Sequence, residues 1–160
     1  MDVEPETDTE MLHVLMSLGM PRARASAVAS EIYSPPRITA MARARPSLGV
    51  LPGFALDLST CDEAGQPWNF DCPAQRAKAR RLVEDTKPLL LVGSPMCTAF
   101  RLLQALNWGR VSPEQKEAIV KRATSHLHFC LELYGLQVRE GRCFLHDHPA
   151  SATSWKDVRM

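Results

Sequence analysis

The chain has 160 residues, of which 45% are hydrophobic and 23% charged, and its formal net charge is +1. These values predict one globular domain, and the balanced charge excludes a uniformly basic nucleic-acid-binding protein and a polyacidic tail. No apolar run approaches the length that spans a bilayer, so we expect no membrane segment. Five cysteines without regular spacing argue against a disulfide framework.

Apolar spacing and turn residues divide the chain into short alternating segments. In chain order they predict helices at residues 8–18 and 22–30, a strand at 31–33, a helix at 38–45, a strand at 53–58, a helix at 73–86, a strand at 89–92, helices at 99–107 and 113–140, and a strand at 143–145. Ser112, Pro113 and Gln115 form a helix start with a capping box, and Gly141 is a typical helix stop.

The alternation of strands and helices predicts an α/β fold with a mostly parallel sheet of four to five strands between two helical layers, a Rossmann-like three-layer sandwich. We expect residues 1–30 to form an acidic, helical N-terminal segment, residues 31–155 the α/β domain and residues 156–160 a tail. The acidic beginning lacks the pattern of a secretory leader, so we expect an intracellular protein, cytoplasmic or nuclear.

Polar residues follow each predicted strand, where ligands of such sheets bind. They include Ser34 and Arg37, then Asp57, Ser59, Thr60 and Asp62, then Ser94, Cys97 and Thr98, and finally His146, Asp147 and His148. Asp57 stands about 20 residues after the first strand–helix turn, the spacing of a ribose-binding acid in dinucleotide folds. A lone acid at a strand end is also a common turn or helix cap.

Cys97 has two interpretations. After a strand and a Ser-Pro-Met turn, its sulfur would lie at a helix N-terminus, which favours a thiolate nucleophile. A buried, inert cysteine is the more common case. A zinc site is a further hypothesis, built on His126, His128, Cys130, Cys143, His146 and His148. No paired metal motif supports it, so we predict no metal site.

Several segments resemble DNA cytosine-5 methyltransferases. Residues 91–100, LVGSPMCTAF, resemble the family's Pro-Cys loop, and residues 142–149, RCFLHDHP, resemble the next strand, which ends in Glu-Asn in that family. Residues 31–36, EIYSPP, look like the first strand and cofactor loop. A closer resemblance is to uncharacterised domains of dinoflagellate retrotransposon-like polyproteins, which share patterns like GFALDL, GSPMCTAF and H-acid-HP followed by ATSW.

The resemblance implies S-adenosylmethionine as cofactor and nucleic acid as substrate or partner. It implies catalytic roles for Cys97, as the nucleophile that attacks the cytosine ring, and for Asp147, which would hold the ring nitrogen. The implied cofactor-binding residues are Glu31, Ser34, Asp57, Asp62, Trp68 and Ser94. The implied nucleic-acid-binding residues are Arg37, Thr98 and His148.

The sequence also departs from the family pattern. Ser34, Pro35 and Pro36 replace the glycines of the cofactor loop, and His148 replaces the asparagine. The alternative hypothesis is therefore a non-catalytic binding module of a mobile-element polyprotein with the same fold. A metal-dependent hydrolase or nuclease that uses the acids and histidines is a third. The chain predicts fewer strands than the complete family sheet, so we expect a truncated copy with an open sheet edge that the N-terminal helices or a partner chain would cover.

Overall fold

The computed structural model describes residues 27–101 and 107–160. Within these ranges the chain forms an α/β fold with a single four-stranded sheet. The helix predicted at residues 8–18 lies outside the described residues, as do most of the helix predicted at 22–30 and residues 102–106 of the helix predicted at 99–107.

The sheet is entirely parallel and has the strand order β2-β1-β3-β4. Its strands are β1 (Ala27–Ile32), β2 (Val50–Leu56), β3 (Leu90–Gly93) and β4 (Cys143–His146). The register between β1 and β2 shifts between Ala29 and Glu31. This arrangement confirms the prediction of a Rossmann-like parallel sheet, with four strands in the described part of the chain.

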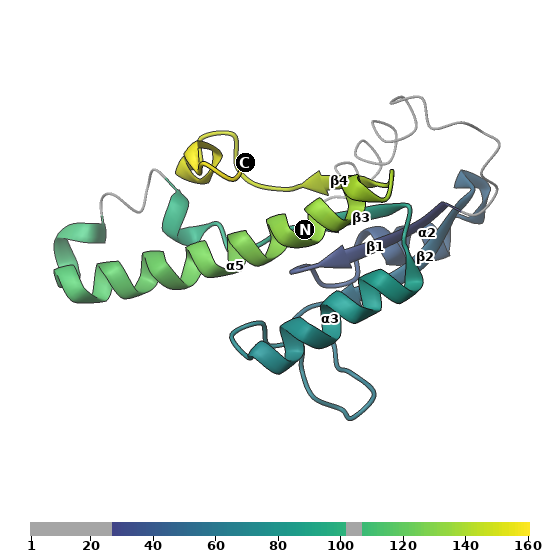
Figure 1. Ribbon diagram of the computed structural model, residues 1–160, viewed down its shortest axis with the longest axis horizontal. Coiled ribbons are helices and arrows are strands. Elements are labelled where there is room, and N and C mark those ends of the chain that lie inside the picture. The colour runs from purple at the N-terminus through teal and green to yellow at the C-terminus, as the bar shows by residue number, and fades with distance from the viewer. Residues whose placement is uncertain (1–26, 102–106) are drawn as a thin grey trace, which may run out of the picture.

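Helices cover both faces of the sheet (Figure 1). The short helix α2 (Ile38–Ala44) packs on one face, and α3 (Pro73–Thr86) and the long α5 (Pro113–Arg139) pack on the other. The N-terminal half of α5 runs beyond the end of the sheet (Figure 1). Four short 3-10 turns complete the described structure, at Pro46–Leu48, Thr98–Phe100, Trp108–Arg110 and Thr153–Lys156.

Two apolar cores lie on opposite faces of the sheet because successive side chains of a strand alternate between its faces. Leu91 of β3 joins Ile32, Val83 and Leu133 in the larger core, beneath α3 and α5. Its neighbours Leu90 and Val92 point the other way, into the smaller core beneath α2. The central strands are thus buried on both sides, as parallel sheets require.

Two predicted segments differ from the structure in type. Residues 27–30, predicted as helix, form the first part of β1, because pairing with both β2 and β3 outweighs the weak helix preference of an alanine-rich segment. At the start of the helix predicted at 99–107, Ala99 and Phe100 lie in the 3-10 turn Thr98–Phe100 and Arg101 is extended. Among the described residues, no helix combines the length and hydrophobicity needed to cross a bilayer.

Candidate functional site

The topological switch point of the sheet lies between its two central strands, β1 and β3. From β1 the chain crosses to β2 on one side, and from β3 it crosses to β4 on the other. Ligands of open α/β sheets bind beyond the carboxyl ends of the strands at such a point. All four strands are parallel, so the loops that follow them lie along one edge, which we call the carboxyl edge.

The loop after β1 is held from inside by Glu31, whose side chain is fully buried. Its carboxylate accepts hydrogen bonds from the backbone N–H groups of Arg37 (3.1 Å) and Thr39 (2.7 Å) and from the Thr39 hydroxyl (2.8 Å). The Ser34 hydroxyl lies 3.0 Å from the same carboxylate. The two amides belong to the first turn of α2, so a carboxylate of the chain itself already occupies the N-terminal end of that helix.

Asp147 connects three loops of the carboxyl edge. Its Oδ2 lies 3.2 Å from the Ser94 hydroxyl, after β3, and 3.7 Å from the Arg37 guanidinium, after β1. Arg37 and Asp147 each keep nearly half of their side-chain surface exposed. The structure therefore brings three of the predicted site residues together at the surface, because Ser94 and Arg37 both contact the carboxylate of Asp147.

Cys97 lies in the loop after β3, half-buried, and its Sγ accepts a hydrogen bond from Nε of Arg101 at 3.3 Å. Thr98 follows it and is exposed. In the described structure, Asp147 and Cys97 share no hydrogen bond, since the carboxylate binds Ser94 and Arg37 while the sulfur binds Arg101. The two residues to which the resemblance assigns catalysis thus have separate partners.

His148 ties the C-terminal turn to the loop after β3. Its ring is nearly buried, with Nδ1 2.7 Å from the Ser154 hydroxyl and Nε2 2.8 Å from the Pro95 carbonyl. Burial lowers the pKa of His148 from its usual value, and the contact with the Pro95 carbonyl opposes this shift. Both ring nitrogens thus have hydrogen-bond partners within the protein. These bonds give His148 a structural role, in place of the predicted contact with nucleic acid.

Asp57 lies just beyond β2. One of its oxygens, Oδ1, accepts hydrogen bonds from the Ser59 backbone N–H at 2.9 Å and from the Ser59 hydroxyl at 2.7 Å, which makes an Asx turn. The side chain borders a pocket of about 90 Å³ that Tyr33 and Ser94 also line. Ligand pockets for drug-sized molecules are about 300–1,000 Å³, so this pocket, as it stands, is too small for a whole nucleoside.

Asp62 and Trp68 lie together on a second pocket, of about 410 Å³, between β2 and α3. The Asp62 carboxylate is almost fully buried and accepts hydrogen bonds from two backbone amides of its own loop and from Nζ of Lys78 at 3.0 Å. The bonds from Gln66 and Lys78 lower the pKa of Asp62 strongly. Both predicted cofactor residues are thus close together, and the carboxylate serves to hold its own loop.

A hydrogen-bonded chain that the sequence did not predict crosses the carboxyl edge. The Tyr33 hydroxyl lies 2.8 Å from Nδ1 of His126, and Nε2 of His126 lies 2.9 Å from Oδ1 of Asp71. Arg122, one turn before His126 on α5, forms a double contact with the same carboxylate. Tyr33 has a positive φ of 60°, a backbone conformation that is rare outside glycine and clusters at functional sites.

The protonation states along this chain follow from its surroundings. The hydrogen bond from Arg122 lowers the pKa of Asp71 to about 2, and burial lowers the pKa of His126 and raises that of Tyr33. At neutral pH, Asp71 is therefore a carboxylate that accepts from Nε2–H of His126. Nδ1 of the neutral ring then accepts the Tyr33 hydroxyl proton.

One signal for this chain was present in the sequence. His126 and Arg122 are four residues apart on a predicted helix and therefore share a face. Their partners lie far away along the chain, Tyr33 by 93 residues and Asp71 by 55, so only the fold brings them together.

The histidines of the zinc hypothesis have separate partners. His126 binds Tyr33 and Asp71, His128 binds Asp157 at 2.9 Å, and Nδ1 of His146 lies 3.0 Å from the Tyr134 hydroxyl. Within residues 27–101 and 107–160, no three His, Cys, Asp or Glu side chains are grouped so that they could hold a metal ion.

No protein-family model, curated protein or solved structure matches this chain.

Proposed function

We propose that this chain is a non-catalytic nucleic-acid-binding module with a methyltransferase-like Rossmann fold, whose cofactor loop is closed by its own side chains. The observation that carries the proposal is the buried Glu31 carboxylate, which accepts hydrogen bonds from the backbone amides of Arg37 and Thr39. Rossmann-like folds bind anionic groups of nucleotides with the N–H groups of this first helix. Here those groups already have an anionic partner.

The rest of the loop supports the same conclusion. Pro35 and Pro36 have no backbone N–H to donate, and the Ser34 hydroxyl is buried against Glu31. The neighbouring pocket at Asp57, of about 90 Å³, is smaller than a nucleoside needs. These residues do not fit S-adenosylmethionine, so we derive no methyl-transfer step.

Nucleic acid is the proposed partner for two reasons. Residues 91–100 and 142–149 resemble segments of a family that acts on DNA. The carboxyl edge also exposes the hydrogen-bonding side chains of Arg37, Thr98 and Arg101, which can contact phosphates.

A second candidate function is an active S-adenosylmethionine-dependent DNA cytosine-5 methyltransferase. The observation in its favour is the hydrogen bond from Nε of Arg101 to Sγ of Cys97, which holds the side chain that this candidate uses as its nucleophile. Asp57, just beyond β2, is where this candidate places the cofactor ribose.

Calorimetry separates the two candidates. We expect no heat of binding when S-adenosylmethionine is titrated into the wild-type chain. In a separate measurement by fluorescence anisotropy, we expect a fluorescein-labelled DNA oligonucleotide to bind at low salt. Asp57→Asn is the matched variant because the amide oxygen keeps the Asx turn to Ser59 while the charge is removed. Binding of S-adenosylmethionine that Asp57→Asn abolishes would reject the module in favour of the enzyme.

A covalent trap tests the chemistry itself. An oligonucleotide with 5-fluorocytosine forms a stable adduct with the nucleophilic cysteine of an active cytosine-5 methyltransferase when the cofactor is present. We expect no adduct with the wild-type chain. An adduct that Cys97→Ala removes and that Cys61→Ala, at an exposed cysteine elsewhere, leaves intact would overturn the proposal.

A further inference from the structure

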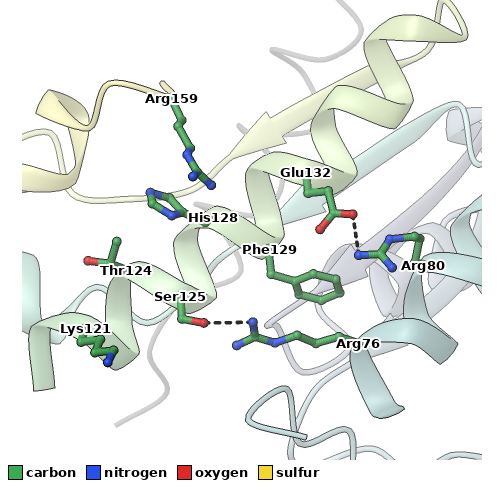
Figure 2. A pocket seen from close by; sticks show the side chains of 9 residues that line it. All are labelled: Arg76, Arg80, Lys121, Thr124, Ser125, His128, Phe129, Glu132 and Arg159. Carbon is green, nitrogen blue, oxygen red and sulfur yellow. Dashed lines mark hydrogen bonds and ion pairs between the residues drawn. The ribbon is translucent and has the colours of Figure 1, made fainter. Parts of the chain in front are cut away.

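A broad groove lies outside the carboxyl edge, between α3, α5 and the C-terminal tail. Its volume is about 690 Å³, within the range of ligand-binding pockets. Figure 2 shows Arg76 and Arg80 reaching into it from α3, Phe129 and Ser125 facing them from α5, and Arg159 approaching from the tail. The groove does not include Glu31, Asp57, Cys97 or Asp147, so it is separate from the predicted cofactor and catalytic residues.

The charge of this groove is strongly asymmetric for a chain whose net charge is only +1. Four permanently positive side chains line it, from three separate segments: Arg76, Arg80, Lys121 and Arg159. Glu132 is the one carboxylate among the lining residues, and it is paired with Arg80. Clustered positive charge in a hollow concentrates the local field and attracts anions.

Arg76 is fixed in place without a carboxylate. Its Nη1 donates to the Ser125 hydroxyl at 2.9 Å, its Nε donates to the Phe70 carbonyl, and its guanidinium lies 5.4 Å from the centre of the Phe129 ring. These partners are uncharged, so none of them neutralises the guanidinium. A guanidinium also has more donors than these two bonds use, so it can bind an incoming oxygen without being moved.

Arg80 supplies a second, independent indication. Its guanidinium pairs with Glu132 through one terminal nitrogen, while its Nε is buried and has no hydrogen-bond partner within the described structure. Buried donors are almost always satisfied, so this one is an exception within the described structure. The groove thus combines the charge of Arg76, whose hydrogen-bond partners are uncharged, with a buried donor on Arg80 that lacks a partner in the described structure.

We propose that the groove between α3 and α5 binds the phosphate backbone of nucleic acid without reading its sequence. Arginine forks suit phosphate oxygens, and the field of Lys121 and Arg159 at the rim would draw a polyanion in. Phe129, the one Phe, Tyr or Trp among the lining residues, is only 3% exposed and is covered by Arg76, so no base can stack on it. Recognition here is therefore backbone contact rather than base readout. This inference rests on the proposed nucleic-acid-binding function and assigns it a second surface.

The test is fluorescence anisotropy of a fluorescein-labelled DNA 20-mer with the full chain, titrated over a range of salt concentrations. The groove variant is Lys121→Glu/Arg159→Glu, which reverses two exposed charges and leaves the bonds of Arg76 intact. The matched control is Arg43→Glu/Arg139→Glu, at exposed residues outside the groove, which changes the net charge by the same amount. Thermal unfolding of each variant verifies that it is folded.

We expect the groove variant to bind at least tenfold more weakly at low salt. We also expect the slope of log K against log salt to become shallower by about one for each phosphate that the protein no longer neutralises. The control should stay within about twofold of the wild type. Equal weakening in both variants, or wild-type affinity of the groove variant, would overturn the inference.

Two further experiments distinguish the ways in which the groove assignment can fail. If Arg37→Ala/Arg101→Ala abolishes binding while the groove variant retains it, nucleic acid binds at the carboxyl edge alone, and only the groove assignment is rejected. If the wild-type chain binds no DNA, the proposed function and the groove assignment both fail. If polyglutamate of matched charge displaces the DNA equally well, the groove takes an acidic peptide, and the phosphate assignment is rejected.

Discussion

Glu31 is the side chain that holds the loop after β1 and the start of α2. Its buried carboxylate exchanges hydrogen bonds to water for hydrogen bonds to Ser34, Arg37 and Thr39, and it places negative charge at the N-terminus of α2. It therefore fixes the direction in which the chain leaves β1. The same bonds that stabilise the fold also close the helix N-terminus to a ligand.

Replacing Glu31 with glutamine should destabilise the protein by about 2–4 kcal/mol. The amide keeps the volume of the side chain but turns an accepting oxygen into a donor that faces other N–H groups. Urea unfolding measures the change, with Glu63→Gln, at an exposed loop residue, as the control expected to change stability by less than about 0.5 kcal/mol. A Glu31→Gln protein as stable as the wild type would contradict this role.

Three histidines, two of them buried and His146 half-buried, make stability depend on pH. Burial lowers the pKa of His126, His146 and His148, and that of His146 falls to about 4, with a smaller contribution from neighbouring His148. The unfolded chain therefore binds more protons than the native one below the usual histidine pKa of about 6.5. The free energy of unfolding should fall as the pH drops from about 6.5 to 4.

For each such histidine the slope is at most about 1.4 kcal/mol per pH unit. Asp71, whose native pKa is about 2, extends the decrease below pH 4, because its stabilising ionisation disappears as the pH falls. Unfolding measured between pH 7 and 4.5 should show a shallower slope in His146→Gln than in the wild type. An unchanged slope would show that His146 does not contribute.

At the scale of elements, α5 meets β3 through a very close approach at Gly93. The Tyr134 hydroxyl lies 3.1 Å from the Gly93 carbonyl and 3.0 Å from Nδ1 of His146, so one side chain of α5 connects β3 with β4. Cys130, one turn earlier, packs against the same glycine. The absence of a side chain at Gly93 thus sets the distance between helix and sheet.

Gly93→Ala should destabilise the protein by about 3 kcal/mol. Its Cβ would lie 2.2 Å from the Tyr134 hydroxyl and 2.4 Å from Sγ of Cys130, so the helix or the strand must move. Gly109→Ala is the matched control, because a Cβ there meets no atom within 4 Å. Thermal unfolding of the two variants measures the difference. Equal stabilities would show that the packing of α5 against β3 tolerates a side chain at residue 93.

The elements that the sequence predicted correctly are those with local signals. The helix at 73–86 begins at a proline and has the predicted bounds, and the capping box of Ser112 and Gln115 is present with both of its hydrogen bonds. Residues 27–30 were predicted wrongly because their strand state depends on two partner strands far along the chain.

The candidate site was predictable only in part, for the same reason. The position of polar residues after strands placed Ser94, Asp147 and Arg37 on one edge, and the structure joins them. The burial of Glu31 and the link between Tyr33 and His126 depend on which face of the sheet each helix covers. No spacing within the sequence carries that information.

Across the whole molecule, protection from solvent decreases from the centre of the sheet to its sides. The central strands β1 and β3 have neighbours on both sides, whereas β2 and β4 each pair with one strand of the described sheet. Phe144 of β4 is 44% exposed, and β2 carries Pro52, which cannot donate to a ladder and blunts an edge against further pairing.

Amide hydrogen exchange should follow this gradient. We expect the slowest exchange in Leu91 and Val92 of β3 and in Ile32 of β1, opening only with global unfolding, and faster exchange in β4. Mass spectrometry of peptides from each strand measures the order. Protection of β4 equal to that of β3 in the isolated chain would indicate that another surface covers this edge.

The close contact between α5 and β3 at Gly93 also makes the reactivity of Cys130 a measure of how often the core opens. Cys61, Cys72 and Cys143 are exposed, while Cys130 is completely buried beside Tyr134, and burial raises its pKa to about 12. A thiol reagent reacts with the thiolate form of a cysteine that it can reach. The exposed cysteines therefore react directly from the folded state, whereas Cys130 reacts only when α5 separates from the sheet. The rate at which Cys130 reacts therefore measures how often the core opens.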